Sequence, residues 1–83
     1  MLTAEQIRAA RGMLRMEQKQ LADQAGVSLP TVKRLEAMSG SLTAVRVDTL
    51  EAIRRAFESA GVIFVDENGE GPGVRLRKQK GRR

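Results

Sequence analysis

Residues 14–36 read LRMEQKQLADQAGVSLPTVKRLE, and this stretch decides the fold. Its first half predicts a short helix over about 18–24, with Leu21 facing inward. Gly26 can adopt the left-handed conformation that ends a helix, and Ser28 can cap the helix that follows. Pro30 then falls in the first turn of a helix predicted over about 29–38, where its missing N–H does little harm. Two short helices joined by a turn that contains Gly predict a helix-turn-helix motif over 18–38.

Helical patterns flank this motif on both sides. Thr3 and Gln6 have the spacing of a capping box, with Leu2 and Ile7 as a hydrophobic staple, so a helix is predicted over about 4–13. After a loop at 39–46, a fourth helix is predicted over about 48–60, with apolar residues on one stripe and Gly61 at its end. The chain is therefore predicted to be mainly α, with four to five helices.

The sequence period changes from helical to strand-like after Gly61. VIFV at 62–65 and VRLR at 74–77 read as strands, and Asn68-Gly69 between them is a strong hairpin signal. Pairing across Asn68-Gly69 predicts one face made of Ile63, Val65, Val74 and Leu76. The opposite face would then hold Val62 and Phe64.

The positive charge of the chain is concentrated at its C-terminal end. The sequence has 83 residues, with 15 Lys and Arg against 10 Asp and Glu, a net charge of +5. Residues 74–83 contain six of the basic residues and no acid, so the other residues sum to −1. The high pI therefore cannot by itself establish nucleic-acid binding by the body of the protein.

The composition excludes several classes of chemistry. The chain has no Cys and no His, which removes disulfides, thiolate catalysis, the usual general base and the commonest metal ligands. No Gly-rich phosphate loop precedes a helix, so the sequence predicts neither an enzyme nor a bound cofactor or metal. No apolar run approaches the roughly 20 residues of a membrane span, and charges interrupt any signal-peptide pattern. We therefore expect a cytoplasmic protein.

The motif resembles the Xre/Cro-type, lambda-repressor-like family of helix-turn-helix transcription regulators. The resemblance rests on Gln18, Leu21-Ala22, the AGVS run at 25–28, Thr31-Val32 and Leu35-Glu36, all at the spacing of that family. With the flanking helices it covers about residues 3–60. The closing segment GVIFVDENGEGPGVRLRK also looks like the strand-turn-strand tail of a bacterial subset of these regulators. The predicted division is a DNA-binding domain over 1–61, a strand extension over 62–77 and, from its composition, a basic disordered tail over 78–83.

The resemblance makes the helix at about 29–38 the recognition helix, which enters the major groove of DNA. Arg34 could bind guanine bidentately, and Thr31 or Leu29 could contact a thymine methyl group. The hydroxyls and the Arg of the following loop suit phosphate contacts. The alternative for each of these residues is ordinary surface solvation. The predicted DNA-binding residues are Gln18, Ser28, Leu29, Pro30, Thr31, Lys33, Arg34, Ser39, Ser41, Thr43 and Arg46.

Two further charged residues are given a structural role by the same resemblance. In this family an Arg of the first helix and a Glu at the end of the recognition helix form a partly buried ion pair. The matching residues here are Arg11 and Glu36. We expect this pair to hold the recognition helix in place.

The strand extension is predicted to make a homodimer, because VIFV is apolar on both faces and one small helical domain can hardly cover it. The strands could pair or exchange between subunits, with Phe57 and Phe64 as aromatic anchors. The alternative is a hairpin that packs back on its own fourth helix. The residues predicted for the dimer contact are Phe57, Val62, Ile63, Phe64, Val65, Val74 and Leu76.

These features predict a sequence-specific DNA-binding regulator of transcription. The simplest form is a homodimeric repressor that binds an inverted-repeat operator. Such a protein would be associated with the nucleoid. The alternative is an antitoxin or accessory protein that also binds a protein partner through the hairpin or the tail. Double-stranded DNA is the expected partner in both cases, and no membrane is involved. The basic tail could contact phosphates without sequence preference, remain solvated or meet an acidic partner.

Overall fold

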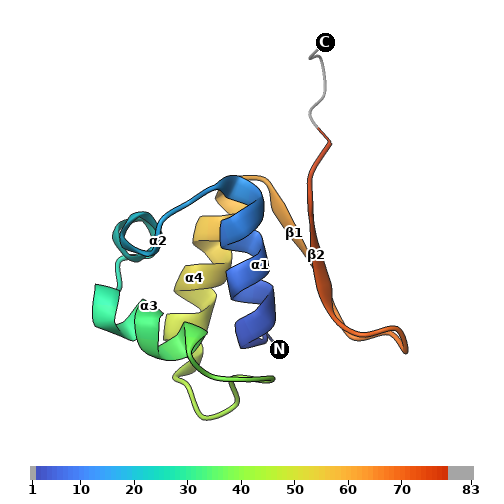
Figure 1. Ribbon diagram of the computed structural model, residues 1–83, viewed down its shortest axis with the longest axis horizontal. Coiled ribbons are helices and arrows are strands. Elements are labelled where there is room, and N and C mark those ends of the chain that lie inside the picture. The colour runs from blue at the N-terminus through green and yellow to red at the C-terminus, as the bar shows by residue number, and fades with distance from the viewer. Residues whose placement is uncertain (1, 79–83) are drawn as a thin grey trace.

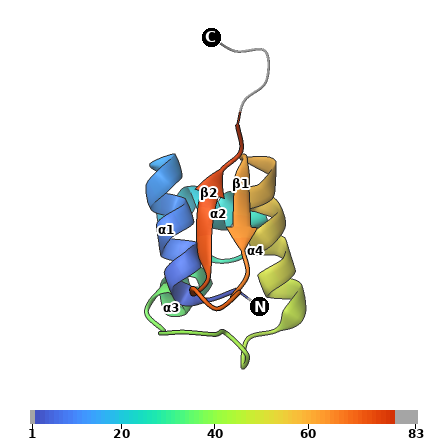
Figure 2. The ribbon, with the colours of Figure 1, turned by 90° about the vertical axis from the view of Figure 1, so that its right-hand side faces the viewer.

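The computed structural model describes residues 2–78, which form four helices and one β-hairpin (Figure 1). The elements are α1 (Ala4–Leu14), α2 (Gln18–Ala25), α3 (Leu29–Glu36), α4 (Val47–Ser59), β1 (Val62–Val65) and β2 (Gly73–Leu76). They form three layers: α2 and α3 on one side, α1 and α4 in the middle, and the hairpin on the other side (Figures 1 and 2). The prediction of a mainly helical fold with a C-terminal hairpin is confirmed.

The helix boundaries follow from local capping. The Thr3 Oγ1 accepts a hydrogen bond from the Gln6 N–H, and the Thr3 N–H donates to Gln6 Oε1, each at 3.0 Å. α2 ends at Gly26, which has a φ of 72°. Ser28 Oγ accepts a hydrogen bond from the Thr31 N–H at 3.2 Å and so caps α3. α3 ends at Glu36, two residues before the predicted end.

A single core joins the helices to the hairpin. Its fully buried members include Ile7 from α1, Leu21 from α2, Leu35 from α3 and Phe57 from α4. Val62 of β1 belongs to the same cluster and is also fully buried. The predicted division at residue 61 therefore separates two segments of chain that share one core.

The predicted faces of the hairpin are wrong. In the structure Phe64 pairs with Val74 and Val62 pairs with Leu76, so these four residues share one face. Pairing across Asn68-Gly69 would instead have placed Ile63 opposite Val74. The loop between the paired strands spans residues 66–72. The register is therefore shifted by one residue from the predicted pairing. This shift moves every apolar side chain of β1 to the other face of the hairpin.

The hairpin packs on the helices of its own chain. The rings of Phe57 and Phe64 meet edge to face with centroids 5.9 Å apart, and the Arg54 guanidinium carbon lies 5.3 Å from the Phe64 ring centroid. The Gln6 side-chain N–H groups donate to the carbonyls of Val65 and Gly73 at 3.2 and 2.9 Å. The hairpin is therefore tied to both middle helices.

This packing corresponds to the alternative of a hairpin that packs back on its own fourth helix. Phe57, Val62 and Phe64 lie in the core of the protomer, with at most 8% of each residue exposed. The physical reason is that the register directs them inward, where α4 covers them. Ile63, Val65 and Val74 are half-buried, and Leu76 is 46% exposed. Among residues 2–78 no helix is long and apolar enough to cross a bilayer.

Candidate nucleic-acid interface

α3 has one buried face and one exposed face. Val32 and Leu35 are buried in the core, whereas Pro30, Lys33 and Arg34 point to solvent. Figure 1 shows α3 on the side of the molecule away from the hairpin, with α2 beside it. The exposed face of α3 therefore presents two adjacent cations and a proline ring on a helix that is fixed from behind.

The first turn of α3 is more constrained than the sequence suggested. Leu29 is half-buried and packs against the core. The hydroxyls of Ser28 and Thr31 lie 2.7 Å apart and hydrogen bond to each other. Among the predicted DNA-binding residues of this turn, only Pro30 is exposed and neither packs against the core nor takes part in the hydroxyl hydrogen bond. The bond between the two hydroxyls uses only one of their O–H groups, so the other O–H remains free to donate.

The predicted ion pair between α1 and α3 is present. Arg11 Nε lies 2.6 Å from Glu36 Oε2, and Arg11 Nη2 lies 2.8 Å from Glu36 Oε1, so the contact is bidentate. Arg11 Nη1 also donates to the carbonyl of Met16 at 2.8 Å. Gln18 Nε2 donates to Glu36 Oε1 at 3.0 Å, which brings the start of α2 into the same network. These contacts fix the end of α3 to both helices that precede it.

The environment of Glu36 favours its ionised form. Burial by itself would raise the pKa of this carboxyl, since only 5% of the side chain is exposed. The hydrogen bonds from Arg11 and Gln18 and the charges of Arg11 and Arg8 outweigh burial and hold the pKa of Glu36 below its usual value. The pKa of Arg11 is raised, chiefly by its hydrogen bonds to Glu36.

The lowered pKa of Glu36 predicts a loss of stability in acid. The carboxylate stabilises the fold fully at pH values above the ordinary glutamate value of 4.5, and this contribution is lost as the pH falls through the lowered pKa of the folded state. Glu5 and Asp48 also have lowered pKa values, so they add to the same trend. We expect the free energy of unfolding of Glu36→Gln to fall less steeply below pH 4.5 than that of the unchanged protein. Urea titrations at several pH values measure this, and equal slopes would contradict the assignment.

Two residues of this region were missed by the sequence analysis. The Arg8 guanidinium donates to the carbonyls of Glu36 and Met38, the latter at 3.2 Å, and this contact accompanies the early end of α3. Glu5 accepts hydrogen bonds from the Gly40 N–H at 3.0 and 3.3 Å. Arg8 lies one helical turn before Arg11, so its spacing could have indicated a second contact with α3.

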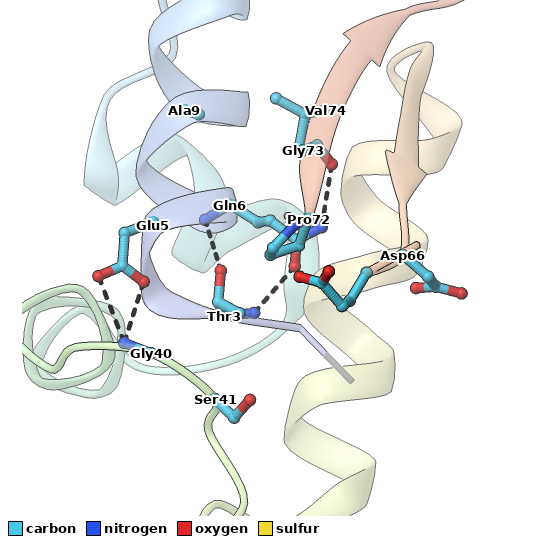
Figure 3. Close-up of a pocket in the computed structure, with 11 residues that line it drawn as sticks. Thr3, Glu5, Gln6, Ala9, Gly40, Ser41, Asp66, Pro72, Gly73 and Val74 are labelled. Atoms are coloured by element: carbon cyan, nitrogen blue, oxygen red, sulfur yellow. Dashed lines mark hydrogen bonds between the residues drawn. The ribbon is translucent and has the colours of Figure 1, made fainter. Parts of the chain in front are cut away.

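The loop at 39–46 splits into two parts. Ser39 and Thr43 are exposed, as the predicted phosphate contacts require, and Arg46 is exposed but hydrogen bonds to Asp48 at 2.9 and 3.1 Å. Those bonds hold the pKa of Asp48 below its usual range. Ser41 pairs with Thr3 and lines a groove beside the hairpin (Figure 3). Ser41 is exposed like Ser39 and Thr43, so it meets the same requirement for a phosphate contact.

This geometry agrees with the comparison of the chain with known protein families. A sequence model described as helix-turn-helix matches residues 7–60. No curated protein sequence matches the chain. Among residues 2–78, no group of acidic residues is arranged to hold a metal ion. Since the match spans well over half of the chain and covers α2, α3 and their supporting helices, the protein belongs to the Xre-type, lambda-repressor-like helix-turn-helix family of DNA-binding regulators.

Proposed function

We propose that the protein is a sequence-specific regulator of transcription, most simply a repressor that inserts α3 into the major groove of its operator. The observation that carries this proposal is the exposed pair Lys33 and Arg34 on a helix whose opposite face is buried. A recognition helix needs this combination, because base contacts require a rigidly placed helix with free polar side chains. The ion pair of Glu36 supplies the rigid placement.

Each exposed residue has a proposed role that follows from its chemistry. Arg34 is the candidate for a bidentate contact to guanine, and Pro30 for apolar contact in the groove. Lys33, Ser39, Thr43 and Arg46 are candidates for phosphate contacts. Gln18 uses one N–H on Glu36 and retains a second for a phosphate oxygen. The hydrogen bond between the Ser28 and Thr31 hydroxyls leaves one O–H free, which makes this pair a further candidate for a contact to DNA.

The proposed active form is a homodimer, because one helix-turn-helix reads only a few base pairs. Two-fold dimers place their recognition helices about 34 Å apart, one turn of DNA, on an inverted repeat. The hairpin lies on the opposite side of the molecule from α3 (Figure 1), so contact between two outward hairpin faces would point the recognition helices apart. We therefore propose a contact along the flank formed by α4 and β1, with Ile63 and Val65 at its margin. Such a dimer would repress by blocking RNA polymerase.

Fluorescence anisotropy at physiological salt tests the proposal with two duplexes of equal length. One duplex has the sequence upstream of the gene for this protein, and the other is a shuffled version. We expect the first to bind about 10³-fold more tightly, the usual gap between specific and nonspecific complexes. Arg34→Ala should weaken that binding by about tenfold to a hundredfold, because one bidentate base contact is lost.

Arg75→Ala is the matched control, because it removes the same charge from an exposed position on the hairpin, across the molecule from α3. It should leave the gap between the two duplexes unchanged. Equal affinity for both duplexes, together with no enriched sequence in a selection from random duplexes, would contradict sequence-specific recognition. Equal effects of the two substitutions would show that Arg34 acts only as a charge.

A further inference from the structure

The segment that follows α3 turns back onto the start of α1. The Ala4 N–H donates to the Gly40 carbonyl at 3.0 Å. Ser41 comes next and pairs with Thr3 in an isolated antiparallel bridge (Figure 3). Segment 38–42 therefore lies against α1 directly after the end of the proposed recognition helix.

Two oppositely charged side chains of α1 hold this segment by its backbone. The Arg8 guanidinium donates to the carbonyls of Glu36 and Met38. The Glu5 carboxylate accepts hydrogen bonds from the Gly40 N–H at 3.0 and 3.3 Å (Figure 3). Glu5 and Arg8 are one helical turn apart, with Arg8 Nη2 3.5 Å from Glu5 Oε2, so each also orients the other. These contacts satisfy backbone groups that lie beyond the last hydrogen bonds of α3.

The middle of segment 38–42 contributes no apolar side chain to the core. It consists of Ser39, Gly40 and Ser41, and both serines are exposed. Gly40 has a φ of 69°, in the left-handed region that glycine adopts without strain. Apolar side chains anchor the two ends of the segment against the core. The position of the exposed middle therefore depends on its backbone hydrogen bonds, and so on the two charged side chains of α1.

The exposed hydroxyls of Ser39 and Ser41 are the groups whose position this arrangement fixes. Hydroxyls suit contacts to phosphate oxygens, because such contacts need a donor held in place and no charge. Arg8 is less suited to touch DNA, since its Nη1 already donates to two carbonyls and its Nη2 lies beside Glu5. The charges of Glu5 and Arg8 offset each other, so the pair brings little net charge to this surface.

We propose that Glu5 and Arg8 are positioning residues for DNA binding, which hold Ser39 and Ser41 where their hydroxyls donate to phosphates beside α3. Neither charged side chain touches DNA. The inference rests on the proposed function, because it requires α3 to lie in the major groove. It adds to the role of Arg11, which fixes α3 itself and not the segment that follows.

The direction in which Glu5 changes DNA affinity tests the proposal. Glu5→Ala removes a negative charge, so electrostatic repulsion alone would make the variant bind DNA more tightly. Positioning predicts the opposite: anisotropy should show a fall of about threefold to tenfold in affinity, since a loosened segment loses one or two hydrogen bonds to phosphate. Glu5→Gln keeps an oxygen that can accept from the Gly40 N–H, so it should bind at least as tightly as the unchanged protein. The Glu5 side chain is 55% exposed, so both variants should stay folded. Tighter binding by Glu5→Ala would overturn the proposal.

A double-mutant cycle shows whether Arg8 acts through the serines. Arg8→Met should lower affinity in the unchanged protein but should have no further effect once Ser39→Ala and Ser41→Ala are present. The slope of log affinity against log salt should stay the same, whereas a direct contact of Arg8 with phosphate would make it shallower by about one. Arg75→Met is the matched control, because it removes the same charge from the hairpin and should not couple to the serines. Additive effects of Arg8→Met and the serine substitutions would overturn the proposal.

Hydrogen exchange in the free protein separates this inference from the proposed function. The Gly40 amide should exchange slowly in the unchanged protein and at least about tenfold faster in Glu5→Ala, while the amide of Leu35 in α3 keeps its rate. A Gly40 amide that is unprotected in the unchanged protein would overturn this inference, whatever the result with DNA. Phosphate contacts carry no sequence information, so Arg8→Met should weaken binding to both duplexes by the same factor. A lack of preference between the duplexes in the unchanged protein would instead count against the proposed function.

Discussion

Replacing Arg11 with Ala is expected to lower the free energy of unfolding by about 3–5 kcal/mol, because it leaves a buried carboxylate without its partner. Glu36 has only 5% of its side chain exposed and receives two hydrogen bonds from Arg11. Removing Arg11 keeps the cost of desolvating Glu36 and takes away most of the compensation. The change also frees the end of α3, so DNA affinity should fall with stability.

Thermal melting followed by circular dichroism measures the effect. In a domain of this size, a loss of 1 kcal/mol in the free energy of unfolding lowers the melting temperature by about 4–8 °C, so the fall in melting temperature should be large. The double variant with Arg11→Ala and Glu36→Ala should be less destabilised than the sum of the two single variants. Arg46→Ala, which breaks an exposed pair with Asp48, should leave the melting temperature nearly unchanged. Equal effects of Arg11→Ala and Arg46→Ala would show that burial of Glu36 is not the cause.

Replacing Phe57 with Ala should destabilise the protein by about 3–5 kcal/mol, the usual cost of removing a fully buried aromatic ring. Phe57 is the largest fully buried side chain and meets Phe64 edge to face. Its loss opens a cavity between α4 and β1. The hairpin should therefore loosen together with the helical core, in one transition.

Melting at several protein concentrations shows whether Phe57 stabilises the protomer or a dimer. A core residue lowers the melting temperature by the same amount at every concentration. A dimer anchor would instead change how strongly the melting temperature depends on concentration. Val47→Ala is the control, since Val47 is 65% exposed at the start of α4. A shift for Phe57→Ala that disappears on dilution would contradict the core assignment.

Sequence patterns predicted the helices because each pattern acts over a few residues. The Thr3 capping box, the left-handed Gly26 and the Ser28 cap all form with partners three or four residues away. Local bonds of this kind are visible in the order of the residues alone. Among the predicted site residues, Lys33 and Arg34 are exposed for the same reason, because the helical period that buries Val32 and Leu35 turns them outward.

The hairpin register and the surroundings of the site depended on contacts between distant parts of the chain. The Asn68-Gly69 signal predicted a hairpin, but not the seven-residue loop that sends Phe64 into the core beside Phe57. Nothing near Ser41 in the sequence indicated that Thr3 would draw it toward the groove.

The sequence by itself thus determined the helices, the turn between α2 and α3, and the outward face of α3. Only the tertiary structure decided which face of β1 is buried, where α3 ends and which residues form the groove. The reason is the range of the interactions. Capping and periodicity act within one or two turns, whereas Gln6 reaches Gly73 and Arg8 reaches Met38 only after the chain has folded back on itself.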